Sequence, residues 1–216
     1  MKARKLLAIA VGLGVALLPS VASAGTGWVI QPTINPSGSS NGGSNNLKAV
    51  SCTSPASCTA VGYYVVSGTT TVVTLAEYWD GTSWAFQLTP NPTSNNELNS
   101  VSCTSAANCI AVGDTSGSSG QVPLAERWNG SSWKIQSVPR PAGGTSSELD
   151  GVSCTSMTAC TAVGKFLSSS GGGPLAERWN GTRWIVQPTP NPTSGTEGEM
   201  RSVKCLSATV CVATGD

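Results

Sequence analysis

The chain has 216 residues, of which 12 are Lys or Arg, 11 are Asp or Glu and none is His. This near-neutral balance offers no basic patch of the kind that nucleic acid requires, so we expect no nucleic-acid partner. The lack of histidine excludes a Ser-His-Asp triad and a histidine-ligated metal within this sequence. The composition therefore favours a non-enzymatic chain without a metal or a cofactor.

Residues 1–24 have the pattern of a secretory signal peptide. Three basic residues within positions 2–5 precede an uncharged apolar run at 6–18, and small residues at 22–24 supply a cleavage point after Ala24. The alternative, a membrane anchor, is disfavoured because the run is shorter than the roughly 20 residues that span a bilayer. Cleavage leaves 9 basic and 11 acidic residues, a net charge of −2. We expect the mature chain to be secreted or displayed at the cell surface, with no membrane span.

A unit of 51 residues recurs along the mature chain, which is the mark of a repeat architecture. Each copy contains two cysteines in the spacing C-x5-C. In an exported chain, a pair that recurs in every unit is expected to form a disulfide within its unit. The alternative, a thiolate metal site, is disfavoured by the spacing and by the lack of histidine. The pairs are Cys52 and Cys58, Cys103 and Cys109, Cys154 and Cys160, and Cys205 and Cys211.

Each unit contains four segments with strand character. In the second unit we expect strands at 98–103, 109–113, 122–128 and 133–138, from their β-branched residues and the turn residues between them. The first two would form a hairpin that the cysteines link, and an Asn-Gly turn would join the last two. A proline-rich link then ends the sheet, because proline cannot donate to the ladder. The unit is thus a four-stranded antiparallel meander.

Such a sheet buries a core only by stacking on its neighbours, and four strands in about 50 residues fit a β-propeller blade. The unit resembles a kelch-type blade in the glycine that ends its second strand, the tryptophan of its third strand and a second tryptophan five residues on. In the second unit these are Gly113, Trp128 and Trp133. One glycine replaces the usual pair, and the cysteines are additional. The resemblance implies an all-β fold, a β-propeller of four-stranded antiparallel blades.

The repeats predict the limits of each blade. The segment W-V-I-Q-P-T at 28–33 matches a fourth strand, and the resemblance implies that such a strand closes the last blade. The last unit stops after its second strand, so we expect this chain to be the front part of a longer reading frame; a four-blade ring with one defective blade is the alternative. The expected segments are a closing strand and linker at 25–46, blades at 47–97, 98–148 and 149–199, and a partial blade at 200–216.

Two sets of residues that recur in every unit invite functional interpretations. Flat tryptophan rings could stack on sugars, but rings at fixed strand positions are more simply explained as packing between blades. Glu77, Glu126 and Glu177 could be catalytic, but an active site is built once, so a capping or cross-strand pair is the better interpretation. The tryptophans assigned to the core are Trp28, Trp79, Trp84, Trp128, Trp133, Trp179 and Trp184.

Binding residues are expected where the units differ. The variable links are 63–74, 114–122 and 165–173. Exposed, unrepeated aromatic and charged residues on such loops are candidate ligand contacts, with solvated Ser/Gly loops as the alternative. The candidates are Tyr63, Tyr64, Arg140, Lys165 and Phe166.

The sequence favours a propeller that binds a protein or a glycan without catalysis. One alternative is the propeller part of a polysaccharide-active hydrolase or lyase whose catalytic residues lie beyond residue 216. The other is a structural spacer, which the Ser/Gly-rich links and the similar blades also fit.

Overall fold

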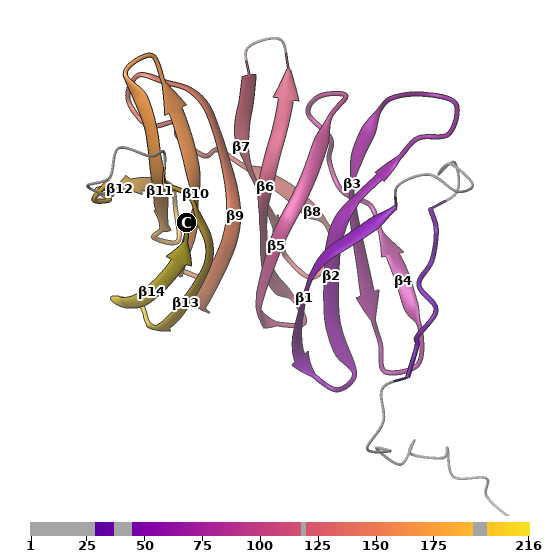
Figure 1. Cartoon of the computed structure of the whole chain (residues 1–216). Coiled ribbons are helices and arrows are strands. Elements are labelled where there is room, and N and C mark those ends of the chain that lie inside the picture. Colours follow the sequence, from indigo (N-terminus) through magenta and orange to yellow (C-terminus); the bar gives the residue numbers. More distant parts are fainter. Residues whose placement is uncertain (1–28, 37–44, 118–119, 192–197) are drawn as a thin grey trace, which may run out of the picture. The chain divides into compact units, whose positions relative to one another are not determined.

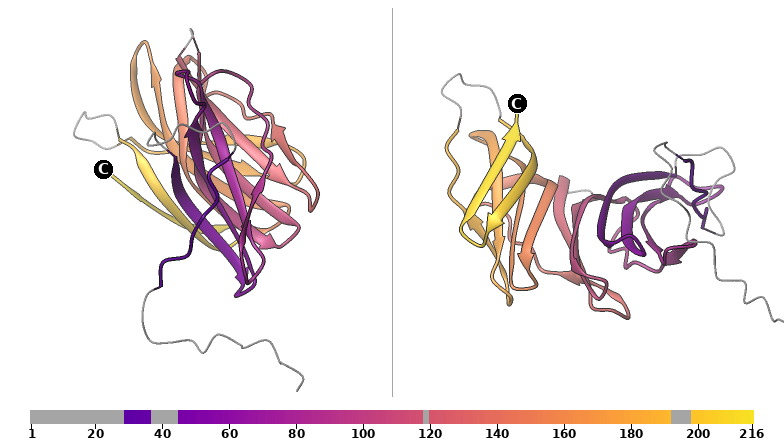
Figure 2. Two further views of the ribbon diagram at one scale, coloured as in Figure 1. Left: turned by 90° about the vertical axis from the view of Figure 1, so that its right-hand side faces the viewer. Right: turned by 90° about the horizontal axis from the view of Figure 1, so that it is seen from below.

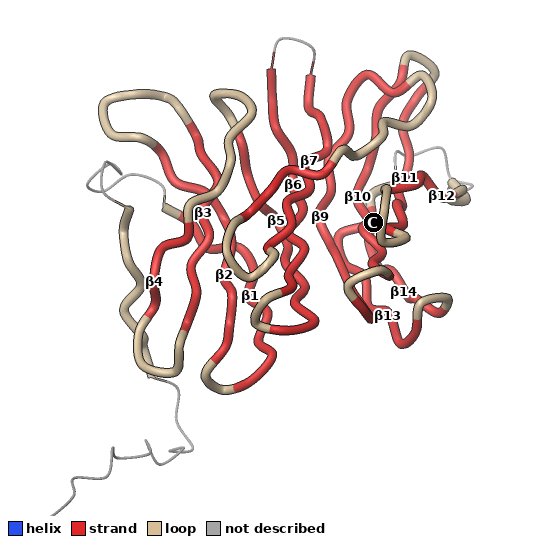
Figure 3. The backbone as a smooth tube through the Cα atoms, turned by 180° about the vertical axis from the view of Figure 1, so that it is seen from behind, coloured by secondary structure: helices blue, strands red, loops and turns tan. Residues whose placement is uncertain are grey.

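All regular structure in the described part of the chain is β-strand. The computed structural model describes residues 29–36, 45–117, 120–191 and 198–216 (Figures 1 and 3). The predicted signal peptide and Trp28 lie outside these ranges. Within them, no helix has the length and apolar character that a membrane crossing needs. All strands belong to the compact unit Pro32–Asp216.

The strands form three four-stranded sheets and one two-stranded sheet, each an antiparallel meander of strands consecutive in sequence. Sheet 1 contains β1 (Asn46–Ser54), β2 (Ser57–Val65), β3 (Val72–Trp79) and β4 (Trp84–Gln87). Sheet 2 contains β5 (Asn96–Ser105), β6 (Asn108–Gly117), β7 (Gly120–Trp128) and β8 (Trp133–Gln136). Sheet 3 contains β9 (Gly144–Ser156), β10 (Ala159–Ser168), β11 (Gly171–Trp179) and β12 (Trp184–Gln187). Sheet 4 contains β13 (Met200–Ser207) and β14 (Val210–Gly215). The all-β fold of propeller-type blades is confirmed.

The first two strands of each sheet are longer than predicted. In sheet 2, Ser105 pairs with Asn108, so the hairpin closes through two residues and not through five. The second strands also continue beyond their glycine, to Val65, Gly117 and Ser168. The sequence predicts links there from serine and glycine, yet these residues keep a ladder pairing: Ser168 pairs with both neighbouring strands, and Gly117 pairs with Gly120 of β7.

The four disulfides are the ones predicted, each within its own hairpin. The two cysteines of each pair are direct partners in the strand register, for example Cys103 and Cys109. Their Cα atoms lie 3.9 to 4.0 Å apart. Each bridge therefore fixes the register of the first hairpin of its sheet.

The hydrophobic core lies between sheets and not within them. One cluster of buried residues joins sheets 1 and 2, one joins sheets 2 and 3, and one joins sheets 3 and 4. The exposed fraction of one repeated valine shows how stacking of the sheets buries side chains. Val101, Val152 and Val203 are 7%, 6% and 9% exposed, whereas Val50, in the first of the described sheets, is 60% exposed. Burial at this position therefore comes from the neighbouring sheet.

The first strands make the closest contacts between sheets: β1 with β5, β5 with β9 and β9 with β13 (Figures 1 and 2). A repeated hydrogen bond fixes this approach. The backbone N–H of Cys103 donates to Ser51 Oγ at 3.0 Å, that of Cys154 to Ser102 Oγ at 2.9 Å, and that of Cys205 to Ser153 Oγ at 3.0 Å. Successive sheets therefore share one relative geometry.

The expected fourth-type strand at 28–33 is not observed. Trp28 lies outside the described residues, and residues 29–36 form no strand. A fourth strand pairs with a third strand, and sheet 4 has only β13 and β14 among the described residues. The segment therefore has no strand edge of the expected kind to pair with.

The disulfide in sheet 2 gives the first prediction. Replacing both Cys103 and Cys109 with serine should lower the free energy of unfolding by about 2 kcal/mol, because the unfolded chain loses a cross-link around a short loop. Guanidinium denaturation of the oxidised proteins measures the difference. A variant within about 0.5 kcal/mol of the parent would contradict the stabilising role of the bridge.

Candidate functional site

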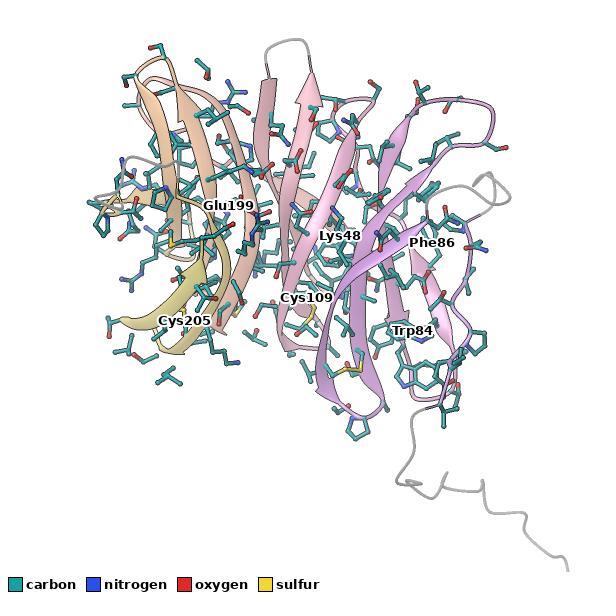
Figure 4. The ribbon with its side chains drawn as sticks, in the orientation of Figure 1. Lys48, Trp84, Phe86, Cys109, Glu199 and Cys205 are labelled. Carbon is teal, nitrogen blue, oxygen red and sulfur yellow. A yellow bond between two sulfur atoms is a disulfide. The ribbon has the colours of Figure 1, made fainter. Side chains whose placement is uncertain are left out.

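A row of polar side chains lies where the first and second strands of the four sheets pair at one end. We call it the inner polar row and define it by three positions of the repeat. The first strands, with the residue just before β13, supply Asn46, Glu97, Glu148 and Glu199, together with Lys48, Asn99, Asp150 and Arg201, and the second strands, with the residue just after β14, supply Tyr63, Asp114, Lys165 and Asp216. Figure 4 labels Lys48 of β1 and Glu199, just before β13, which belong to this row. It also labels Trp84 and Phe86 of β4, at the other edge of sheet 1.

A β-bulge presents the most variable of these side chains. In each sheet the pairing register skips a residue of the first strand at more than one place, and at one of these repeated places the skipped residues are Lys48, Asn99, Asp150 and Arg201. Bulges redirect a side chain away from the regular alternation of a strand. The scaffold therefore turns the same position of every unit out of the ladder, and each unit has a different residue there.

The repeated glycine allows this geometry. A Cβ atom on Gly113 would lie 2.0 Å from the carbonyl oxygen of Glu97, and Gly164 approaches Glu148 in the same way, at 2.1 Å. No side chain fits at those distances. The glycine that marks the end of the predicted second strand is therefore required by the close approach of the first strand beside the bulge.

The row forms two groups of side-chain contacts, and each group crosses from one sheet to the next. Lys48 pairs with Glu97 and donates to Asn99 Oδ1 at 2.8 Å. Lys165 Nζ lies 2.9 Å from Glu148 Oε1 and 3.1 Å from Glu199 Oε2. Two further contacts extend this second group: Gln121 Nε2 donates to Glu148 Oε2 at 2.8 Å, and Arg201 Nη2 lies 3.1 Å from Glu199 Oε2. Most of these groups are half-exposed, so the row presents both donors and acceptors to solvent.

Burial, together with neighbouring carboxylates, raises the pKa of two acids in the row. Burial, and then the nearby charges of Glu148 and Glu199, raise the pKa of Asp150 to about 7. Burial also raises the pKa of Asp114. The carboxylate of Glu148, which accepts a hydrogen bond from Lys165, raises the pKa of that ammonium. The row therefore keeps its cations charged while one of its acids titrates near neutrality.

Three carboxylates of the row could offer oxygen ligands to a cation. One oxygen from each of Glu148, Asp150 and Glu199 lies within 4.8 Å of the other two. Oxygen ligands of this kind suit Ca²⁺. Lys165 and Arg201 already pair with two of the three carboxylates, so the cluster as it stands is a set of ion pairs.

The five predicted ligand contacts do not form one site. Tyr63, Tyr64, Lys165 and Phe166 lie on β2 and β10 and not on loops, so the expected placement was wrong. Tyr63 and Lys165 occupy the same repeat position in the inner polar row, and Lys48 Nζ lies 5.1 Å from the Tyr63 ring centre.

The other three predicted contacts lie elsewhere. The ring of Tyr64 meets that of Phe86 edge-on, with centres 6.4 Å apart. Phe166 packs against the hydrophobic cluster between sheets 2 and 3. Arg140, in the link after β8, donates from Nη2 to the carbonyl oxygen of Gln121 at 3.0 Å. Their surroundings are those of packing and anchoring residues.

The repeated tryptophans form pairs on the third and fourth strands. Trp79 and Trp84, Trp128 and Trp133, and Trp179 and Trp184 are direct register partners, with ring centres 5.6 to 5.8 Å apart. Trp128 Nε1 donates at 3.1 Å to the carbonyl oxygen of Ala106, in the turn of the disulfide-linked hairpin. The other two units repeat this bond. Each pair thus ties the two hairpins of its sheet together.

The repeated glutamates are sealed in the core. Glu77, Glu126 and Glu177 are at most 1% exposed, and neither oxygen of Glu126 or Glu177 has a hydrogen-bond partner among the described residues. No described basic residue forms an ion pair with them, so the expected cross-strand pair was wrong. Burial raises the pKa of Glu126 and of Glu177 to about 8. Glu126 and Glu177 are therefore buried carboxylic acids, whereas Glu77, although also buried, borders a pocket beside Ile34 and Leu75.

The sequence analysis missed most of the inner polar row, although a signal was present. The motif L-K-A-V-S-C reappears as L-N-S-V-S-C, L-D-G-V-S-C and M-R-S-V-K-C, so its second position is Lys, Asn, Asp and Arg in turn. Such variation inside a repeated strand marks a position that the scaffold does not need. This position lies within a strand, whereas the predicted binding residues were confined to the links and their borders.

Comparison with known proteins gives no family for the chain. No family model matches it, and no curated protein matches it in sequence. The kelch resemblance therefore stays a prediction from the repeat motif.

The buried acids predict how stability depends on pH. Glu126 and Glu177 keep their protons in the folded protein up to about pH 8, whereas the unfolded chain releases them near the ordinary value of 4.5. The folded state therefore binds more protons between these values, and the free energy of unfolding should fall as pH rises from about 4.5 to about 8. Each group contributes up to about 1.4 kcal/mol per pH unit.

Urea denaturation at pH 5, 6, 7, 8 and 9 measures this slope. The double variant Glu126→Gln, Glu177→Gln should flatten it, because an amide does not titrate. A free energy of unfolding that rises with pH in the parent protein would contradict the assignment.

Proposed function

We propose that the protein is a secreted or cell-surface β-propeller that binds a protein or a glycan without catalysing a reaction, and that the inner polar row makes the contact. The scaffold supplies a fixed set of bulges, and the variable residues on them supply the recognition. The binding partner is expected to carry both donors and acceptors, because the row presents Lys48 and Arg201 beside several carboxylates.

The observation that carries this proposal is the bulge position. The leucine or methionine before it, the small residue after it and the valine that follows recur in every unit, whereas Lys48, Asn99, Asp150 and Arg201 differ in charge and length. Structural constraint alone explains a repeated residue but not four different ones at one geometry. Binding residues are commonly found where a rigid scaffold presents variable side chains.

Two further observations support an extracellular, non-catalytic role. Four disulfides are compatible with an oxidising environment outside the cell. The chain has no histidine, and the acids with the largest shifts in pKa, Glu126 and Glu177, are sealed in the core. The reachable groups of the row suit hydrogen bonding and ion pairing.

A paired set of variants tests the proposal. The purified mature chain is applied to an array of oligosaccharides and peptides, and the dissociation constant of each hit is measured by calorimetry. Lys48→Asn, which copies the residue of sheet 2, together with Lys165→Met should weaken binding by about 10-fold or more, because charged hydrogen bonds are lost. Leu88→Ser, at a residue 81% exposed on the link after β4, is the control and should change nothing.

Two outcomes would count against this function. Saturable binding that survives the row variants and is lost in the Leu88→Ser control would place the contact elsewhere. Cleavage of an oligosaccharide by the purified chain would make it an enzyme.

A further inference from the structure

Comparison of equivalent positions in the repeats shows two unusual basic residues at the fourth-strand edge of the sheets, which we call the outer edge. Lys134 on β8 stands where the first and third sheets have Ala85 and Ile185. Arg183, in the turn before β12, stands where the first and second sheets have Ser83 and Ser132. The scaffold works with small or apolar residues at both positions, so it does not require the charges.

The two charges have no partner in the part of the chain that the structure describes. Both side chains are exposed, and all five ion pairs of the described residues belong to the inner polar row and its neighbours. Lys134 and Arg183 therefore present positive charge to solvent.

Arg183 lines a groove between sheets 2 and 3. The groove has a volume of about 400 Å³. Its lining includes Gln136, Ser137 and Pro139 from the end of β8 and the link after it, and Trp179, Arg183 and Trp184 from sheet 3. Lys134 precedes Gln136 by two residues, so both side chains lie on the face of β8 that is turned toward sheet 3.

The groove holds a fixed donor. Trp184 Nε1 donates to Gln136 Oε1 at 3.0 Å, which orients the amide. The Nε2 of Gln136 has no hydrogen-bond partner among the described residues and is free to donate to a ligand. Ser137 and Thr182 also line the groove, and the Thr182 hydroxyl, which donates to Asn180 Oδ1 at 2.8 Å, can still accept a hydrogen bond, while Pro139 adds an apolar wall. A small-molecule site typically has a small number of precisely placed polar groups in a mostly apolar lining.

An equivalent groove between sheets 1 and 2 serves as an internal comparison. It has a volume of about 520 Å³ and repeats the anchored amide, since Trp133 Nε1 donates to Gln87 Oε1 at 2.9 Å. Its lining includes Phe86, Leu88 and Ser132 and contains no ionisable side chain. The two grooves therefore share one geometry and differ in charge.

We propose that the groove between sheets 2 and 3 binds a carboxylate-bearing sugar of an anionic polysaccharide. The guanidinium of Arg183 offers a planar fork that matches a carboxylate, and Lys134 adds a second positive charge. The Gln136 amide and the hydroxyls of Ser137 and Thr182 can hydrogen-bond to sugar hydroxyls. An acidic peptide has few hydroxyl groups to form such bonds. This site goes beyond the proposed function, because it lies at the opposite edge of the sheets from the inner polar row.

Calorimetry with a galacturonic acid tetrasaccharide tests this site, with a galactose tetrasaccharide as the neutral match. We expect one site per chain for the acidic sugar and at least 10-fold weaker binding of the neutral one. Arg183→Ser should weaken binding of the acidic sugar at least 10-fold, and Lys134→Ala several-fold. Both substitutions copy residues of other units, so they should leave the melting temperature unchanged.

A gain of function gives the complementary test. Ser132→Arg places the same guanidinium in the neutral groove and should raise the stoichiometry from one site to two. Equal affinity for both sugars, or full binding by Arg183→Ser, would overturn the proposal. Tighter binding of a poly-glutamate peptide of equal charge would overturn it in favour of an acidic protein segment.

The inner polar row is tested separately in the same titrations. Lys165→Met should leave binding of the acidic sugar unchanged. If that variant loses the sugar and Arg183→Ser keeps it, the groove proposal fails while the proposed function of the row stands.

Discussion

The contact between successive first strands is the constraint on which the rest of the structure depends. A four-stranded sheet of this size cannot bury both of its faces alone, and Val50 shows what the isolated face looks like. Where β5 meets β1, or β9 meets β5, the same valine is buried and a serine of one sheet accepts the N–H of a cysteine in the next. Stability is therefore shared between neighbours.

This constraint divides the residues of each unit into two groups. Leucine, glutamate, tryptophan, glycine and the cysteine pair recur because every sheet, or every interface between sheets, has the same construction, and their repetition removes them as candidates for recognition. What remains is small: the bulge position and its neighbours at the inner end, and a few residues that border the outer grooves. Lys48 and Arg183 belong to this remainder, and both stand where other units have unrelated residues.

The sequence predicted the features that follow from periodicity. The disulfides, the meander and the stacking of sheets each depend on spacing that recurs every 51 residues, so a local error in one unit is corrected by the others. The placement of Tyr63 and Lys165 on loops was wrong because the length of a strand depends on its neighbours, and Ser/Gly composition says little about a strand paired on both sides. The row was missed because Lys48 and Glu97 meet only when two sheets stack.

Net charge, the first quantity taken from the sequence, hides how the charges are divided. Burial raises the pKa of Glu126 and Glu177 to about 8, so these acids are largely neutral near pH 7 and do not balance the basic residues. Glu97 and Glu148 are instead paired with lysines within the inner polar row. A chain of nearly zero net charge thus has a compensated network at one edge of its sheets and uncompensated cations at the other. Because charges attract a ligand through local fields and not through the total, the outer edge of sheets 2 and 3 is the part of this scaffold that favours an anion.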